Sequence, residues 1–160
     1  MKTATMLATA GVALAALGGA VWWASSDHAA ESNQERAALR PDDSRLTARG
    51  ASIYAAQCAS CHGANLQGQP NWRERGPDGL LPAPPHDASG HTWHHPDALL
   101  IRITRDGVAA VAGDPNYRTA MPIYRGLMRD EDIVAVLSWI KSRWPEDVRA
   151  KHDQINAQSR

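Results

Sequence analysis

The sequence C-A-S-C-H at residues 58–62 constrains this chain more than any other feature. Two cysteines three positions apart lie on one side of a helical turn, and a histidine follows directly. This spacing is the attachment signature of c-type haem, because both sulfurs can reach the two vinyl groups on one porphyrin edge. The next residue then turns its imidazole under the ring and binds iron. We therefore predict one covalent haem c, held by Cys58, Cys61 and His62.

The cysteine count limits every other use of these thiols. Cys58 and Cys61 are the two cysteines of the 160-residue chain, so a four-cysteine metal site and a disulfide-dense scaffold are excluded. A redox dithiol is the main alternative, but that motif belongs beside a βαβ unit, and no strand pattern is evident here. The remaining alternative is two buried thiols beside an unrelated histidine.

Charge and composition exclude two further classes of protein. The chain has 17 basic and 17 acidic side chains, so its formal net charge is zero. A nucleic-acid-binding domain would show a basic excess. At 43% apolar residues, the chain is also too hydrophobic to remain disordered. A small globular domain with an extension is therefore expected.

The N-terminal extension contains an uncharged, apolar run over residues 3–24 that follows Lys2. About 22 helical residues span about 33 Å, which is close to the thickness of a bilayer's hydrocarbon core. Trp22 and Trp23 lie at its far end, where indole rings favour the membrane interface. We predict a single transmembrane anchor with the domain exported, and a cleaved signal peptide is the alternative. Residues 25–43 are polar and are expected to form a linker.

Helical periodicity dominates residues 44–145, which we expect to form the folded domain. Capping residues, a proline, a glycine and oppositely charged helix ends mark the boundaries of three helices. These helices are expected over residues 45–57, from Pro96 to a stop at Gly107, and over residues 130–143, where Asp130 can serve as the N-cap. Residues 146–160 are expected to be a polar C-terminal tail with one short exposed helix at most.

A long loop over residues 63–95 separates the first two predicted helices. A loop of about this length without secondary structure is unusual in a compact domain unless it wraps a large group that is not protein. The loop contains four histidines, which allow a second metal site, a histidine as the second iron ligand, or hydrogen bonds around the haem edge. These histidines are His86, His91, His94 and His95.

Residues 44–145 resemble the class I monohaem cytochromes c, in particular the small bacterial membrane-anchored type. The resemblance rests on CHGANLQG, PAPPHDASGHTWHHPD, TAMPIY and the last helix. It implies an all-α, cytochrome c-like fold of about three to five helices around one covalent haem, preceded by the transmembrane helix. It also implies an electron-transfer protein rather than an enzyme.

The resemblance further implies roles for individual residues. Met121, which is followed by proline, is expected to be the distal iron ligand, while a core position for Met121 and ligation by Met128 are the alternatives. A carbonyl of Pro84 or Pro85 is expected to accept the second N–H of His62. Trp93 is a candidate donor to a haem propionate. Gly50 and Trp139 are expected where the first and last helices cross, and Tyr54 stands where many relatives have phenylalanine.

The predicted function is one-electron transfer through a haem with His62 and Met121 as axial ligands. The expected partner is a membrane-bound or periplasmic redox protein of a respiratory chain, with no nucleic acid and no small-molecule substrate. The expected location is the bacterial inner membrane, with a single span and the haem domain in the periplasm, or the soluble periplasm after cleavage. A haem subunit of a larger oxidoreductase complex, a redox sensor, and an enzyme or gas-binding haem protein are the alternatives.

Overall fold

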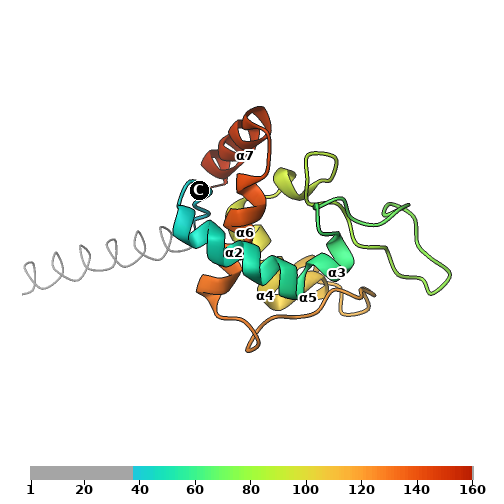
Figure 1. The fold of residues 1–160 in the computed structure, drawn as a ribbon. Helices are drawn as coiled ribbons and strands as arrows, with labels where there is room; N and C mark the ends of the chain where they lie inside the picture. Colours follow the sequence, from blue (N-terminus) through green and yellow to red (C-terminus); the bar gives the residue numbers. More distant parts are fainter. Residues whose placement is uncertain (1–37, 160) are drawn as a thin grey trace, which may run out of the picture. The chain divides into compact units, whose positions relative to one another are not determined.

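The computed structural model describes residues 38–159, and this part of the chain is helical with no strand (Figure 1). An isolated bridge between Arg125 and Met128 is the one β-type pairing there. The elements are α2 (Ser44–Gln57), α3 (Ala59–His62), the 3₁₀ turn η1 (Thr92–His94), α4 (Asp97–Asp106), α5 (Val108–Ala112), α6 (Asp130–Ser142) and α7 (Glu146–Gln158). The all-α prediction is therefore confirmed for the described residues.

The crossing of α2 and α6 organises the fold. The Asp43 carboxylate caps α2 by accepting hydrogen bonds from the backbone N–H groups of Arg45 and Leu46. At Gly50 the helices approach so closely that an added Cβ would overlap the Ala135 carbonyl oxygen and lie 2.8 Å from the Trp139 Cβ. The Gly50–Trp139 crossing implied by the resemblance is confirmed.

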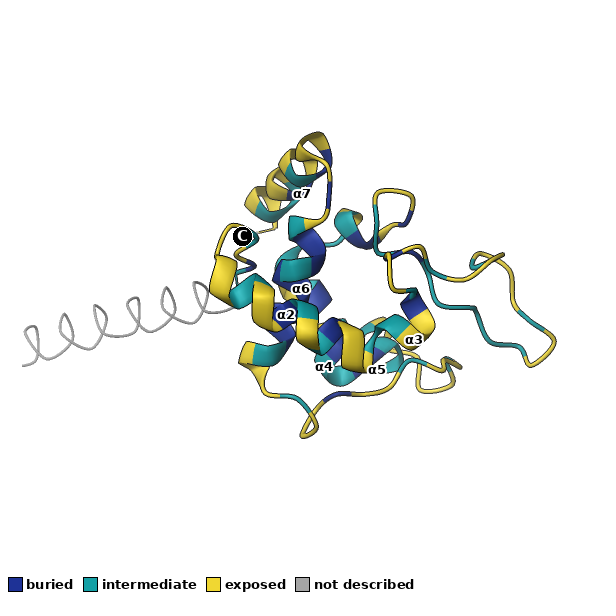
Figure 2. Ribbon diagram, viewed as in Figure 1, coloured by how far each residue is buried: buried dark blue, intermediate teal, exposed yellow. Residues whose placement is uncertain are grey.

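The hydrophobic core gathers around α6, which is buried along most of its length (Figure 2). A helix that is apolar on several faces must be covered by neighbours on each of them. Residues from α2, α4 and the loop after α3 provide that cover through Tyr54, Leu100 and Leu66. The α2–α6 pair therefore forms a rigid support for the haem motif, which begins at the residue after α2 ends.

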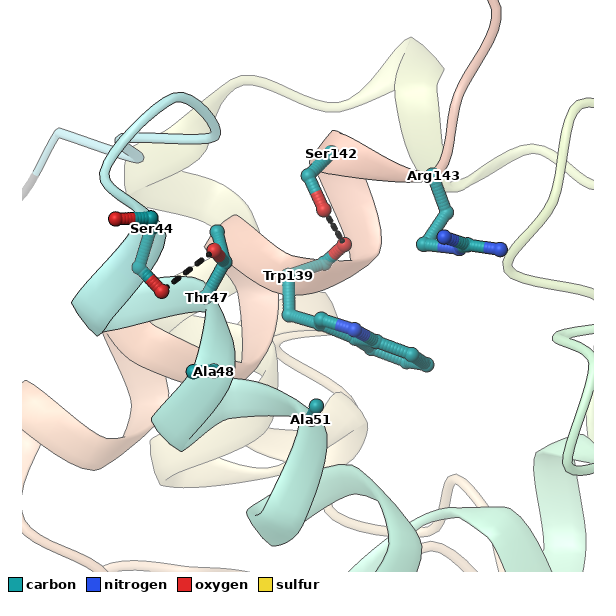
Figure 3. Close-up of a pocket in the computed structure, with 7 residues that line it drawn as sticks. All are labelled: Ser44, Thr47, Ala48, Ala51, Trp139, Ser142 and Arg143. Atoms are coloured by element: carbon teal, nitrogen blue, oxygen red, sulfur yellow. Dashed lines mark hydrogen bonds between the residues drawn. The ribbon is translucent and has the colours of Figure 1, made fainter.

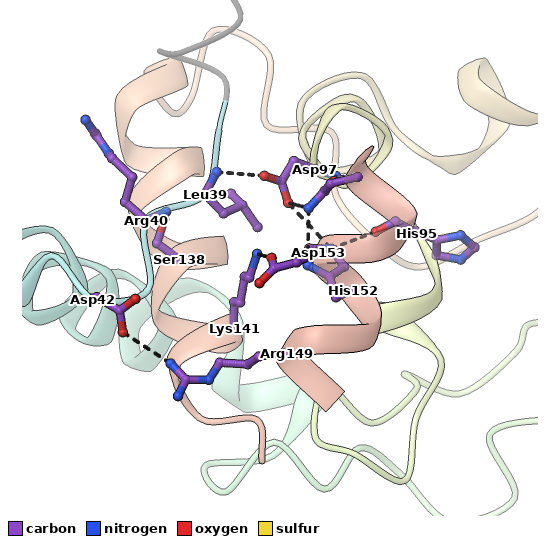
Figure 4. Close-up of polar contacts among 11 residues, drawn as sticks. Leu39, Arg40, Asp42, His95, Asp97, Ser138, Lys141, Arg149, His152 and Asp153 are labelled. Carbon is purple, nitrogen blue, oxygen red and sulfur yellow. Dashed lines mark hydrogen bonds and ion pairs between the residues drawn. The ribbon is translucent and has the colours of Figure 1, made fainter. Parts of the chain in front are cut away.

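The C-terminal segment differs from the polar tail that its sequence predicts. Helix α7 is 13 residues long and packs against η1, with His152 fully buried. Asp97 holds this helix, because its N–H donates to the Asn156 side chain at 2.8 Å and its carboxylate accepts from the same amide at 3.0 Å (Figure 4). The apolar periodicity of the α7 sequence is weak, because several side chains by which this helix contacts the domain are polar.

The end of the expected linker is also part of the folded domain. Leu39 is buried in the core, and its backbone N–H donates to the Asp97 carboxylate at 2.9 Å. The N–H of Arg40 donates to the Ser138 hydroxyl at 2.9 Å (Figure 4). The predicted linker over residues 25–43 is therefore too long at its C-terminal end, because the apolar side chain of Leu39 belongs to the core.

Helix boundaries and helix number differ in detail from the expectation. Pro96 lies just before α4 rather than in its first position. Asp130 is the first residue of α6 and not its N-cap, which is Arg129 and makes no side-chain capping hydrogen bond. Six α-helices occur over residues 38–159 instead of three to five, because α3 and α5 have only four and five residues, too few to show a period.

None of the helices within residues 38–159 is long and apolar enough to cross a membrane. The predicted anchor over residues 3–24 lies outside the described residues.

Candidate haem site

The two cysteines lie at the junction of α2 and α3. Cys58 closes α2, since its N–H donates to the Tyr54 carbonyl at 2.9 Å, and its own carbonyl accepts from His62 N–H at 2.9 Å. Neither cysteine forms a disulfide within residues 38–159, and Cys58 is half-buried while Cys61 is exposed. The Tyr54 hydroxyl donates to the Gly63 carbonyl at 2.8 Å and closes the turn after the motif. Both sulfurs are thus available to form thioether bonds.

The acidity of Cys58 argues against the redox-dithiol alternative. Burial, followed by the neighbouring Cys61, raises the pKa of the Cys58 thiol to about 11. A dithiol that exchanges disulfides needs a thiolate, and its reactive cysteine has a lowered pKa. No βαβ unit surrounds the motif in the described part of the chain. The chemistry of this pair fits capture by a cofactor better than thiol exchange.

The His62 side chain is held in a way that would allow it to bind a metal. Its buried ring donates from Nδ1 to the Pro84 carbonyl at 2.8 Å, which leaves the Nε2 lone pair for a metal. Burial lowers the pKa of His62, and the hydrogen bond to Pro84 opposes this only in part, so the imidazole is neutral. A carbonyl that fixes the tautomer and orientation in this way is a common partner of metal-bound histidines. The geometry selects Pro84 over Pro85, which the sequence left open.

Two glycines hold the Pro84–Pro85 peptide in place. Gly68 has a positive φ of 66°, and an added Cβ would collide with the Pro84–Pro85 backbone. Gly68 N–H also donates to the His62 carbonyl at 2.8 Å. On the other side, a Cβ at Gly90 would overlap the Pro85 carbonyl oxygen. The long loop is therefore built to bring the Pro84 carbonyl up to His62.

The histidines of the loop do not form a metal site. His86 stacks on His62 with ring centroids 3.9 Å apart and planes 21° apart, so it lies beside the proximal histidine, and the structure gives no support for His86 as a replacement for Met121. His91 stacks on Trp72 at 5.2 Å, and its ring meets His95 edge-on at 5.4 Å. No cluster of three or more metal-binding side chains occurs within residues 38–159. The interpretation as a folded loop fits this arrangement.

Met121 lies in an irregular segment between α5 and α6 that is anchored at its far end. Met121 is half-buried, and its N–H donates to the Thr119 hydroxyl at 3.1 Å. Three residues later, the buried Tyr124 donates from its hydroxyl to the Gln57 carbonyl at 2.9 Å. Gln57 immediately precedes Cys58, so one hydrogen bond links the Met121 segment to the haem motif. Sequence reasoning missed this role of Tyr124, which had no signal beyond its proximity to Met121.

The indole N–H of Trp93, which is predicted to donate to a haem propionate, donates to a backbone carbonyl in this structure. Its indole N–H donates to the Ala88 carbonyl at 3.3 Å, and its ring stacks on His94 at 3.6 Å. The Lys151 ammonium lies 5.9 Å from the ring centroid. A role for Trp93 at a propionate stays a prediction.

Two surface hollows occur beside the haem motif rather than at it. One of about 290 Å³ lies along α2 and α6, where the Trp139 indole forms one wall (Figure 3). The second, of about 170 Å³, shares Trp139 and Arg143 and reaches Leu66 in the loop after α3. Cys58, Cys61 and His62 line neither hollow, so neither hollow is the place where these residues would hold a haem.

These side chains fit a haem on several grounds. Cys58 and Cys61, which form no disulfide, lie one helical turn apart. The His62 ring uses Nδ1 in its hydrogen bond to Pro84 and keeps Nε2 for a metal. Apolar side chains near Met121 are exposed. Ile123 is 55% and Leu127 is 78% exposed, and both lie in the same irregular segment as Met121. Together these features define a c-type haem protein.

Comparison with known proteins agrees with this class. Residues 47–144 match the family described as Cytochrome c, and this match covers more than half of the chain. The chain therefore belongs to the cytochrome c family, and its haem c is attached covalently through Cys58 and Cys61. No solved structure matches the chain.

Proposed function

We propose that this cytochrome is a one-electron carrier whose iron is bound by His62 and Met121 in both oxidation states. When bound, the haem supplies the one-electron couple between Fe(II) and Fe(III). The chain holds the ligands, excludes water and sets the reduction potential. A thioether ligand is neutral and soft, and it favours Fe(II) and raises that potential.

The hydrogen bond between Tyr124 and Gln57 is the observation that carries this proposal. Its length of 2.9 Å keeps the Met121 segment near the motif that binds the porphyrin. Two backbone hydrogen bonds, from Tyr124 N–H to the Thr104 carbonyl at 3.3 Å and from Arg125 N–H to the Arg105 carbonyl at 2.8 Å, fix the same segment to α4. A distal ligand that must not exchange requires such a restrained segment.

Met128 is the weaker candidate for the distal position. It is partly buried and packs against the hydrophobic core. Its N–H donates to the Tyr124 carbonyl at 2.9 Å, in the turn that leads into α6. A side chain engaged in the core supports the fold rather than a metal.

The proposed partner is a membrane-bound or periplasmic redox protein of a respiratory chain. Over residues 44–145 we count 11 basic and 9 acidic side chains, and two haem propionates would offset that excess. Strong electrostatic steering is therefore not expected. Anchoring by residues 3–24 in the inner membrane would replace steering by raising the effective concentration of the partner.

The test uses the purified full-length protein. The oxidised form is expected to show the far-red charge-transfer band of a methionine–Fe(III) bond, and the reduced form is expected to bind no added carbon monoxide. A missing band together with rapid carbon monoxide binding would contradict His/Met ligation and favour a gas-binding or catalytic haem. Crosslinking in native membranes then identifies the redox partner.

A further inference from the structure

The imidazole of His86 lies against the imidazole of the iron ligand. The His62 and His86 ring centroids are 3.9 Å apart, and the planes are nearly parallel at 21°. The Tyr54 ring meets His86 edge-on at 6.4 Å, so aromatic rings enclose the stack. Covalent attachment through Cys58 and Cys61 and the proposed binding of iron by His62 and Met121 do not use His86, so its ring has no assigned role.

The side chain of His86 is fixed by the same peptide that fixes His62. Its Nδ1 lies 2.8 Å from the hydroxyl oxygen of the buried Thr92. The same hydroxyl lies 3.4 Å from the Pro85 carbonyl, to which it can donate. Pro84 holds one ring of the stack and Pro85, through Thr92, holds the other.

The backbone of His86 is restrained on both sides. Its N–H donates to the Leu66 carbonyl at 2.8 Å, and its carbonyl accepts from the Trp144 indole at 2.7 Å. Trp144 is buried in the core that follows α6. The backbone that carries the His86 ring is therefore held to two parts of the domain.

We propose that His86 is a positioning residue that fixes the plane of the His62 imidazole and lowers the reduction potential of the haem. The proposal rests on the proposed function only in taking His62 as an iron ligand. The face of an aromatic ring is electron-rich and attracts positive charge. A ligand to Fe(III) carries more positive charge than a ligand to Fe(II), so the stack stabilises the oxidised protein more.

The test compares His86→Leu, His86→Phe and a matched control in the full-length, haem-loaded protein. His91→Leu is the control, because His91 lies in the same loop and stacks on Trp72 rather than on His62. Each variant is measured by its midpoint potential and by the g-values of its oxidised form in electron paramagnetic resonance. The g-values report the orientation of the proximal imidazole.

We expect His86→Leu to favour reduction about threefold, a rise of about 28 mV at 59 mV per tenfold change for one electron. Its g-values should also change, while His86→Phe stays near the parent because it keeps an aromatic face. The control should change neither quantity. An unchanged potential and unchanged g-values in His86→Leu would overturn the proposal, as would an equal shift in His91→Leu.

If His86→Leu does not load haem, a second variant tests the proposal. Thr92→Val keeps the His86 ring and removes its anchor, so a change of g-values is expected, and unchanged g-values would refute the positioning role. The parent protein tests the proposed function separately, because a missing methionine band or carbon monoxide binding there concerns Met121. The comparison of variants requires only that His62 binds iron.

Discussion

The Tyr124 hydroxyl donates a 2.9 Å hydrogen bond to the carbonyl of Gln57, 67 positions earlier in the chain. This contact joins the segment that contains Met121 to the last residue of α2, which precedes Cys58. The two sides of the proposed haem site are thus linked by one buried phenol.

Replacement Tyr124→Phe removes this link and keeps the ring. We expect the free energy of unfolding to fall by about 1 kcal/mol, because the Gln57 carbonyl loses its partner. The far-red methionine band should also disappear at a lower denaturant concentration. Tyr117→Phe is the control, since the Tyr117 ring lies near the Arg75 guanidinium rather than at Gln57. Equal stability of the parent and Tyr124→Phe would contradict the link.

Replacement Met121→Ala tests the proposed distal ligand. We expect loss of the far-red band, binding of carbon monoxide by the reduced protein and a lower midpoint potential, because the ligand that favours Fe(II) is removed. Met128→Ala should keep the band and lose stability instead, since Met128 packs on the core. The opposite assignment, with the band lost only in Met128→Ala, would exclude Met121 as the ligand.

Replacement Gly50→Ala tests the helix crossing. In an ordinary helix interior this change stabilises by about 1 kcal/mol. Here the added methyl group would overlap the Ala135 carbonyl oxygen, so we expect a net loss of at least about 2 kcal/mol. Denaturant unfolding of the haem-loaded protein measures the sign, and a stabilised variant would show that α2 and α6 are further apart.

Truncation tests where the folded domain begins. A protein that starts at residue 37 behind a foreign signal peptide should load haem with the stability of the full chain. A protein that starts at Ser44 loses the buried Leu39 and the hydrogen bonds to Asp97 and Ser138. We expect it to be less stable by about 2–4 kcal/mol. Equal stability of the two truncated proteins would mean that residues 37–43 are only a linker.

The buried His152 predicts loss of stability in acid. Burial, and next the positive charge of Lys141, lower its pKa below the ordinary 6.5, while Asp97, Asp153 and the hydrogen bond to the His95 carbonyl oppose that shift. The unfolded chain therefore binds more protons here than the folded one. The stabilisation that His152 contributes is fully present above pH 6.5, and it is lost as the pH falls toward the pKa of His152 in the folded protein.

The measurement is the free energy of unfolding as a function of pH in the parent and in His152→Gln. The parent should lose stability more steeply below pH 6.5. Part of the slope remains in the variant, because burial lowers the pKa of His91 and His95 as well. His94→Ala, which changes an exposed ring, serves as the control. Identical slopes in the parent and His152→Gln would contradict the assignment.

The local features of the haem site were predictable from sequence because they depend on short spacing. Cys58, Cys61 and His62 lie within one turn, and the charge pattern of α6 marks its length to within one residue. Gly50 and Trp139 were recognised through the family resemblance. Each of these depends on neighbours in the chain or on a pattern shared by many relatives.

Long-range contacts decided the rest, because sequence spacing does not show which buried polar groups become partners. The choice of Pro84 over Pro85 depends on a 2.8 Å contact across 22 positions, and the stack of His86 on His62 depends on the path of the whole loop. The sequence predicts a polar tail at α7 and a linker at Leu39, yet hydrogen bonds to the Asp97 carboxylate hold both segments to the domain. Residues 58–62 by themselves determined that a haem is attached, whereas the packing around them decided how the His62 side chain is held.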